Sequence, residues 1–177
     1  LVIGMTCCFL IFVYVKDELS YDRFHRDSQN IYRVGLQGKI AGQEIFTTNS
    51  SIPLAPTMQV EIPGVEEVMR MIPATGSSGI AFRYDDKAIP EQKVFYADSN
   101  FFNFFSFKLI QGDVSTALKE PNSVVITDEL ALKYFGSDDP IGKIITIGND
   151  KWPCQVTGIS EQTPSNSHFD FNAIISY

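Results

Sequence analysis

The residues most able to support nucleotide chemistry are two glycines and a lysine, Gly136, Gly142 and Lys143. A phosphate-binding loop needs closely spaced backbone amides followed by a lysine and a hydroxyl residue. The gap between these glycines is one residue too long, and Ile144 stands where Ser or Thr is required. The helix expected here also precedes the loop instead of following it. We therefore do not expect this chain to bind nucleotides.

Nucleophilic and metal-binding residue types occur, but their spacing supports no reaction. The segment 76–79 (GSSG) is one residue short of a nucleophile elbow and is interpreted as part of a loop. The two histidines, His25 and His168, lie near opposite ends of the chain, and no sequence argument brings them together. We expect no catalytic residue, no cofactor-binding residue and no metal site.

The cysteines and the paired acids also have ordinary explanations. Cys7, Cys8 and Cys154 are odd in number and two are adjacent, which indicates neither a disulfide framework nor a four-ligand zinc site. We expect Cys154 to be a small buried apolar residue. Adjacent carboxylates in turns are usually solvated, so a glycosidase dyad is not indicated by the pairs Glu66–Glu67, Asp85–Asp86 and Asp138–Asp139.

Composition narrows the class of protein. The 177 residues are 44% hydrophobic and 20% charged, as in a globular protein with a sizeable core. The net charge is -7, and no block of five or six like charges occurs. This balance lacks the electrostatic footprint of a nucleic-acid-binding protein, so we expect no nucleic-acid partner.

The amino-terminal residues 1–15 (LVIGMTCCFLIFVYV) contain no charge and are followed at once by Lys16, Asp17 and Glu18. A helix of this length covers about 22 Å, which is less than the roughly 30 Å of a hydrocarbon core. The chain begins without Met, and the end of a truncated transmembrane helix fits best. A signal peptide and a buried core helix are the alternatives. Charges after the run are balanced and do not set its orientation.

The remaining pattern predicts an α+β architecture of strand pairs interleaved with short helices. A helix over 17–30 is expected to continue the apolar segment and join it rigidly to the domain. Turn and cap residues predict strands at 31–39, 43–49, 80–84, 87–97, 123–127, 141–147 and 152–159, helices at 53–62 and 128–135, and a loop at 74–79. Asp128 is expected to cap the second of these helices, and Gly136 to end it.

Five phenylalanines fall within residues 98–107 (DSNFFNFFSF). Asp98 or Ser99 could cap a short helix that gathers these rings into one cluster. We interpret the cluster as an aromatic part of the core, with a ligand cage as the alternative. Replacing Phe102 or Phe105 by Ala should then cost about 3 to 5 kcal/mol.

Laid out in order, these segments resemble the MacB-like periplasmic core domain of the FtsX family of ABC transporter permeases. The resemblance begins with the apolar run and residues 18–34 and covers nearly the whole chain. Its further segments are 65–71, 96–102 (YADSNFF), 104–112, 121–136 (PNSVVITDELALKYFG), 139–143 (DPIGK), 156–159 (VTGI) and 166–169 (NSHF). Each piece is a cap, a turn or a strand, and the order and spacing together carry the likeness.

The resemblance implies an α+β fold with mixed sheets and short helices in two lobes, preceded by the end of a transmembrane helix. Residues 1–15 would end that helix and 16–177 would form the extracytoplasmic domain, cut short before the chain returns to three more membrane helices. A porter-like lobe near the membrane would contain 31–72 and the carboxyl-terminal strands, and a more distal β-rich lobe would lie at about 80–147. The likeness also implies that His168 is a structural residue at a turn.

The implied function is coupling of cytoplasmic ATP hydrolysis to transport, efflux or mechanotransmission across the bacterial inner membrane. The domain would face the periplasm and would not itself be an enzyme. Its implied partners are a cytoplasmic ABC ATPase subunit, a second permease copy, periplasmic or outer-membrane proteins, and the inner membrane. The alternative is an extracytoplasmic ligand-binding sensor domain of a membrane receptor. An anchored hydrolase would require a catalytic constellation that the sequence lacks.

Overall fold

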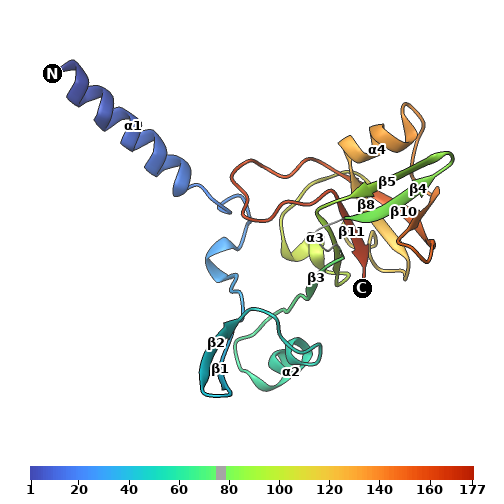
Figure 1. The fold of residues 1–177 in the computed structure, drawn as a ribbon, viewed down its shortest axis with the longest axis horizontal. Coiled ribbons are helices and arrows are strands. Elements are labelled where there is room, and N and C mark those ends of the chain that lie inside the picture. The colour runs from blue at the N-terminus through green and yellow to red at the C-terminus, as the bar shows by residue number, and fades with distance from the viewer. Residues whose placement is uncertain (75–78) are drawn as a thin grey trace.

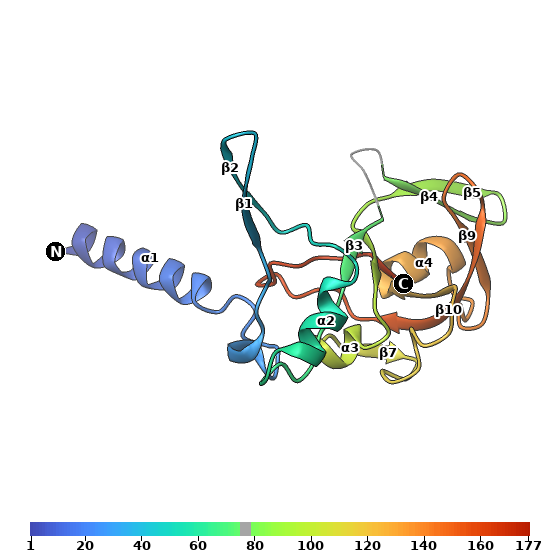
Figure 2. The ribbon, with the colours of Figure 1, turned by 90° about the horizontal axis from the view of Figure 1, so that it is seen from below.

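The computed structural model describes residues 1–74 and 79–177 (Figure 1). A helix projects at the amino-terminal end, a small hairpin with a short helix follows, and a large sheet with two further helices forms the body (Figures 1 and 2). Residues 75–78, which make up most of the loop predicted at 74–79 and of the segment 76–79, lie outside the described residues.

The body is built on one nine-stranded mixed sheet, which confirms the predicted α+β class. Its strand order is β3-β6-β11-β8-β10-β9-β4-β5, and β7 pairs with β10. The pairs β8–β10 and β6–β11 are parallel, and the other pairs are antiparallel. The strands are β3 (Met71–Pro73), β4 (Ile80–Tyr84), β5 (Lys87–Glu91), β6 (Val94–Ala97), β7 (Leu109–Gln111), β8 (Ser123–Thr127), β9 (Ile144–Ile147), β10 (Trp152–Ser160) and β11 (Ala173–Ser176).

The centre of this sheet is buried on both faces. Side chains alternate across a strand, so successive residues of β8 enter different apolar clusters. Val124 and Ile126 join the cluster beneath helix α4 (Asp128–Phe135), whereas Val125 joins the cluster of α3 (Phe101–Phe104). All five residues of β8 are buried, which explains its continuous apolar sequence SVVIT.

Helix α4 shows how local sequence fixes an element. Its N-cap is Thr127, one residue before the predicted Asp128, and the Thr127 hydroxyl accepts a hydrogen bond from the Leu130 amide. Asp128 instead accepts a bond from the adjacent Glu129 amide. The predicted cap was wrong because β8 runs directly into the helix, so that its last residue, Thr127, is also the N-cap. Gly136 ends the helix with a φ of 62°, as predicted.

The phenylalanine segment forms the predicted aromatic part of the core. Phe101, Phe102 and Phe107 are buried, and Phe169 and Phe171 from the carboxyl-terminal segment pack with them. Neither of the predicted caps donates or accepts a capping side-chain bond at α3, whose N-cap is Asn100.

Asp98, one of those two predicted caps, is engaged elsewhere. Its carboxylate accepts hydrogen bonds from the Arg70 amide at 2.8 Å and from the Arg70 guanidinium at 2.7 Å. A charge-assisted pair of this kind competes successfully with a neutral amide for the same acceptor.

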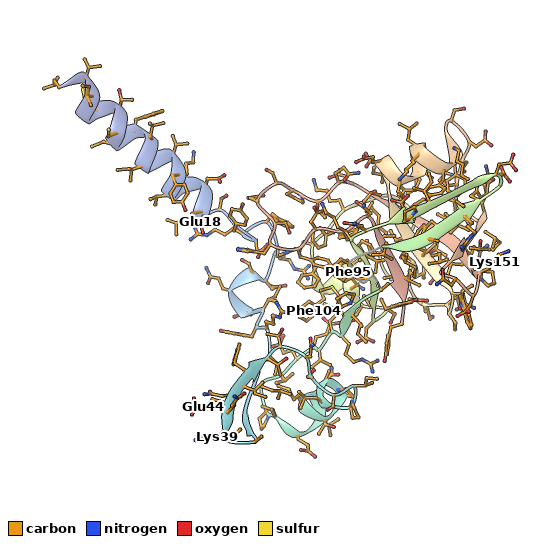
Figure 3. All side chains as sticks on the ribbon, viewed as in Figure 1. Glu18, Lys39, Glu44, Phe95, Phe104 and Lys151 are labelled. Atoms are coloured by element: carbon orange, nitrogen blue, oxygen red, sulfur yellow. The ribbon has the colours of Figure 1, made fainter. Side chains whose placement is uncertain are left out.

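Residues 31–66 form a projecting unit that we call the arm. It contains β1 (Leu36–Ile40), β2 (Gln43–Thr47) and α2 (Leu54–Glu61). Ala41 and Gly42 make the predicted turn with positive φ values of 51° and 83°, and β1 pairs with β2 alone. The first strand begins at Leu36, five residues later than predicted. Lys39 and Glu44 mark the tip of this hairpin in Figure 3.

The division into one lobe of residues 31–72 with the carboxyl-terminal strands and another at about 80–147 remains an expectation, to which the sheet order adds one observation. The carboxyl-terminal strands were assigned to the same lobe as residues 31–72, but β10 and β11 pair with β6, β8 and β9 in the body. Strand neighbours in a mixed sheet are chosen by packing between distant segments, which the order along the chain does not reveal.

Helix α1 (Val2–Glu18) ends at the first charged residues, and the helix predicted over 17–30 does not continue. Residues 19–27 make turns, followed by the short 3-10 helix η1 (Ser28–Asn30). None of the helices in the described ranges is both long enough and apolar enough to cross a membrane. The side chains of α1 are exposed all around the helix (Figure 3).

Candidate functional site: the junction between helix α1 and the sheet

The turn that follows α1 joins the helix to the body, and we call residues 19–27 the junction. The Leu19 amide donates to Val15 O and the Ser20 amide donates to Asp17 O, which closes the helix. Asp22 then adopts a φ of 57° and reverses the chain. A non-glycine residue in this conformation needs surrounding contacts to hold it.

One side of the junction is hydrogen-bonded to the loop that precedes β11. The Asp22 amide donates to Asn166 O at 2.9 Å, and the Asn166 side-chain amide donates to Ser20 O at 3.0 Å. The Asp22 carboxylate accepts the His168 amide at 3.0 Å, and its second oxygen lies 2.8 Å from His168 Nδ1. The ring of Tyr21 packs on the His168 ring with centroids 4.6 Å apart. Both backbone and side chains therefore tie the turn to this loop.

The other side of the junction docks on the segment that follows α3. His25 is 5% exposed, and its Nδ1 accepts a hydrogen bond from the Ser106 amide at 3.2 Å. The Arg26 amide donates in turn to the Ser106 hydroxyl at 2.9 Å. Two consecutive residues of the junction thus share one partner in the body.

Aromatic packing completes this second contact. The His25 ring lies 4.0 Å from Phe24, 5.1 Å from Phe105 and 5.1 Å from Phe107, measured between centroids. Burial lowers the pKa of His25 below its ordinary value of 6.5, and the negative charge of Asp22 opposes that shift in part. Because Nδ1 accepts a backbone amide, this geometry requires the neutral imidazole.

The loop bonded to the junction leads directly to the centre of the sheet. Phe171 is fully buried in the aromatic cluster, and Asn172 N donates to Lys93 O at 2.8 Å. The next residues form β11, which lies between β6 and β8. The junction is thus connected to the central strands through the 166–171 loop and the aromatic cluster.

The structure places both histidines at the junction, on different sides of it, which no pattern in the sequence indicated. His168 lies at a turn and pairs with Asp22, as a structural residue would. Among the residues that the structure describes, no group of three or more His, Cys, Asp or Glu side chains could hold a metal ion.

The other residues considered for chemistry have structural surroundings. Lys143 Nζ lies 3.0 Å from Asp138 Oδ2 and 5.3 Å from the Phe135 ring centroid. Hydrogen bonding to Asp138 raises the Lys143 pKa. Cys154 is buried, as predicted, and burial raises the pKa of its thiol to about 11. Cys7 and Cys8 are exposed on α1.

Sequence reasoning missed one buried acid, Glu91. Its carboxylate accepts hydrogen bonds from Lys133 Nζ at 2.6 Å and from the Tyr134 hydroxyl at 2.7 Å. These hydrogen bonds connect β5 to α4. The sequence offered little signal for it, because Glu91 lies in the middle of the strand predicted over 87–97.

The chain is similar to a known family and to solved structures of other proteins. The sequence matches the family described as the MacB-like periplasmic core domain over residues 1–177. A domain of a protein named as a permease, from Porphyromonas gingivalis, shares 27% identity with a TM-score of 0.58, and the match covers 70% of this chain and 55% of that one. The periplasmic region of MacB from Actinobacillus actinomycetemcomitans shares the fold at 23% identity with a TM-score of 0.54, covering 73% and 56%.

The chain therefore spans little more than half the length of these two structures. No curated protein matches this chain. The family match over the full length shows that the chain belongs to the family of MacB-like periplasmic core domains.

Proposed function

We propose that this chain is the periplasmic domain of an ABC transporter permease, and that the junction passes conformational change between a membrane helix and the domain. The observation that carries the proposal is the two-sided attachment of residues 20–26, to Asn166 and His168 on one side and to Ser106 on the other. A turn held by opposed contacts can transmit a displacement, whereas a free linker cannot.

The proposal includes the end of a membrane helix in residues 1–15. In support, α1 contains no charge before Lys16, and its large apolar side chains are exposed on every side, for example Phe9 at 65% and Phe12 at 64%. A helix that is apolar all round is normally surrounded by protein or by lipid. The domain would then face the periplasm from the bacterial inner membrane.

The partners follow from the same proposal. A permease of this type would pair with a cytoplasmic ABC ATPase subunit and with a second permease copy, and ATP would be hydrolysed on the ATPase. Periplasmic or outer-membrane proteins are further partners. The cargo, whether effluxed or signalled, would be recognised by the assembled protein.

The first experiment is extraction of the full-length protein from native membranes in mild detergent, followed by mass spectrometry of the copurified proteins. An ATPase subunit in the complex is the expected result. A kinase, or no nucleotide-hydrolysing partner, would overturn the proposal.

The second experiment tests the route of coupling in that complex. Amide hydrogen exchange of the β6 and β11 peptides is compared with and without ATP. The double variant Asp22→Ala with Asn166→Ala should abolish the ATP-dependent change in exchange while the complex still assembles. Asp86→Ala, an exposed acid in the β4–β5 turn, is the matched control and should leave the change intact. An undiminished response in the double variant would contradict coupling through the junction.

A ligand-binding sensor domain is the second candidate. A hollow of about 380 Å³ lined by Tyr96, Trp152, Cys154 and Ile175 favours it, because this volume lies within the range of small-molecule sites. Tight, specific binding of one compound in a chemical-shift screen would support the sensor. Further membrane spans and an ATPase partner would support the permease.

A further inference from the structure

The chain contains two histidines, and both lie at the contact between the junction and the body. Histidine is the side chain whose charge ordinarily changes between pH 5 and 8. The two rings are placed differently. His25 is 5% exposed within a ring of aromatic side chains, and His168 is exposed beside a carboxylate.

Protonation of His25 would break its contact with the body. A proton on His25 Nδ1 removes the acceptor of the Ser106 amide and places a charge among the rings of Phe24, Phe105 and Phe107. A buried charge without a partner is strongly unfavourable. His168 instead lies on the exposed side of the junction, with its Nδ1 2.8 Å from the Asp22 carboxylate.

The charged groups around His25 do not offset this loss. Asp22 is the acid that acts on His25, but its two oxygens already contact the backbone amide and the ring of His168. Arg26 and Asp27, next along the chain, are exposed and paired with each other at 3.1 Å. The segment facing His25 from the body contributes Ser106 and two phenylalanines, with Lys108 exposed beyond them.

We propose that His25 makes the second contact of the junction a proton-sensitive latch, closed when the ring is neutral and released from the 105–107 segment when it is protonated. The first contact includes the bonds from the Asp22 amide to Asn166 O and from the Asn166 side chain to Ser20 O, which involve no titratable side chain and keep the turn attached to the loop. Acid would thus convert a two-sided attachment into a one-sided one. The consequence for coupling rests on the proposed function, whereas the latch itself is a property of the domain.

The sign of the effect follows from the direction of the shift. The closed latch lowers the His25 pKa, so the open form binds more protons. The latch is therefore most stable above pH 6.5 and weakens as the pH falls below that value. Between about pH 7.5 and about pH 5.5 the ratio of open to closed latch rises by up to about tenfold, the limit set by the ordinary value of 6.5.

The test is amide hydrogen exchange of the full-length protein in nanodiscs at these two pH values, corrected for the intrinsic pH dependence of exchange. In peptides covering 23–27 and 105–107, the ratio of open to closed states should be higher at the lower pH, by up to about tenfold. Peptides of β8 serve as the internal reference and should not change. Equal protection of the junction at both pH values would overturn the proposal.

Matched variants assign the effect to one ring. His25→Asn keeps an acceptor near the Ser106 amide and does not titrate, so the acid response should disappear. His168→Asn keeps a donor toward Asp22 and should retain the full response. A response that survives in His25→Asn, or that is lost in His168→Asn, would contradict the assignment.

A direct titration covers the case in which a His25 variant fails to fold. Hydrogen–deuterium exchange at the imidazole C2 atom of the unmodified protein reports the pKa of each histidine. A His25 pKa below 6.5 is expected, and a value at or above 6.5 would overturn the latch. Absence of an ATPase from the purified complex would instead remove the proposed function and leave the latch standing.

Discussion

The body and the arm contain similar apolar side chains, but the body buries them and the arm leaves them exposed. The body buries Phe82, Val124, Val125, Ile126 and Ile174 completely, on both faces of a nine-stranded sheet. Within the arm, no side chain that the structure describes is buried, and Phe46 and Val60 are 72% and 86% exposed. The arm is a two-stranded hairpin and an eight-residue helix, a size that seldom folds independently.

The comparison teaches that local pattern and stability are separate properties. The Ala41–Gly42 turn and Pro53 at the start of α2 favour the conformation of the arm through local geometry. Apolar burial, which contributes most of the folding free energy, is confined to the body. Identical substitutions in the two regions should therefore differ sharply in cost.

The largest difference is expected between two phenylalanines. Phe102→Ala should lower the free energy of unfolding by about 3 to 5 kcal/mol, because the side chain is 3% exposed within the aromatic cluster. Phe46→Ala in the arm should change it by less than about 0.5 kcal/mol. Equilibrium denaturation of the chain in mild detergent, followed by Trp152 fluorescence, measures both. Equal costs would show that the arm is part of the cooperative core.

A smaller difference is expected between two glycines with positive φ. In Gly112→Ala the new Cβ would lie 2.7 Å from Thr157 O and 2.9 Å from Gly158 Cα, both of them backbone atoms of β10. Backbone strain and overpacking together should cost about 2 to 4 kcal/mol.

Gly42→Ala carries the same kind of backbone strain, with φ values of 83° and 96° at Gly42 and Gly112, but its Cβ meets no atom within 4 Å. We expect a cost of about 1 kcal/mol or less, seen as faster amide exchange in the hairpin. A global loss of stability in Gly42→Ala would contradict the separation of the two regions.

The smallest difference concerns two threonines. Thr127→Ala removes the cap of α4 and should cost about 1 kcal/mol, because the Leu130 amide loses its acceptor. Thr57→Ala, on the exposed surface of α2, should be neutral within about 0.5 kcal/mol. The thermal unfolding midpoints of the two variants measure this difference. An unchanged midpoint for Thr127→Ala would show that the Thr127 cap does not stabilise α4.

Much of the local structure could be predicted because it depends on neighbouring residues. The β1–β2 turn, α2, α4 with Gly136, and the β9–β10 hairpin each follow from turn or cap residues within the element itself. The aromatic cluster was predicted in kind from five phenylalanines in ten residues. Its full membership was not, because Phe24, Phe169 and Phe171 arrive from distant parts of the chain.

The candidate site could not be predicted in the same way. The helix expected over 17–30 ends at Glu18, because Ser20 and Asp22 exchange helical hydrogen bonds for bonds to Asn166 and His168. Those partners are 146 residues away from Ser20 and Asp22 respectively. No local pattern indicates a contact of that separation.

The sequence by itself determined the apolar amino-terminal helix, the α+β class, several turns, the glycine that ends α4, and the family to which the chain belongs. These properties rest on composition and on interactions within a few residues. Only the tertiary structure decided the strand order, the placement of the carboxyl-terminal strands in the body, and the places of His25 and His168 on the two sides of the junction. The physical reason is that these features arise from packing between distant segments, where one residue finds its environment only after the sheet has formed.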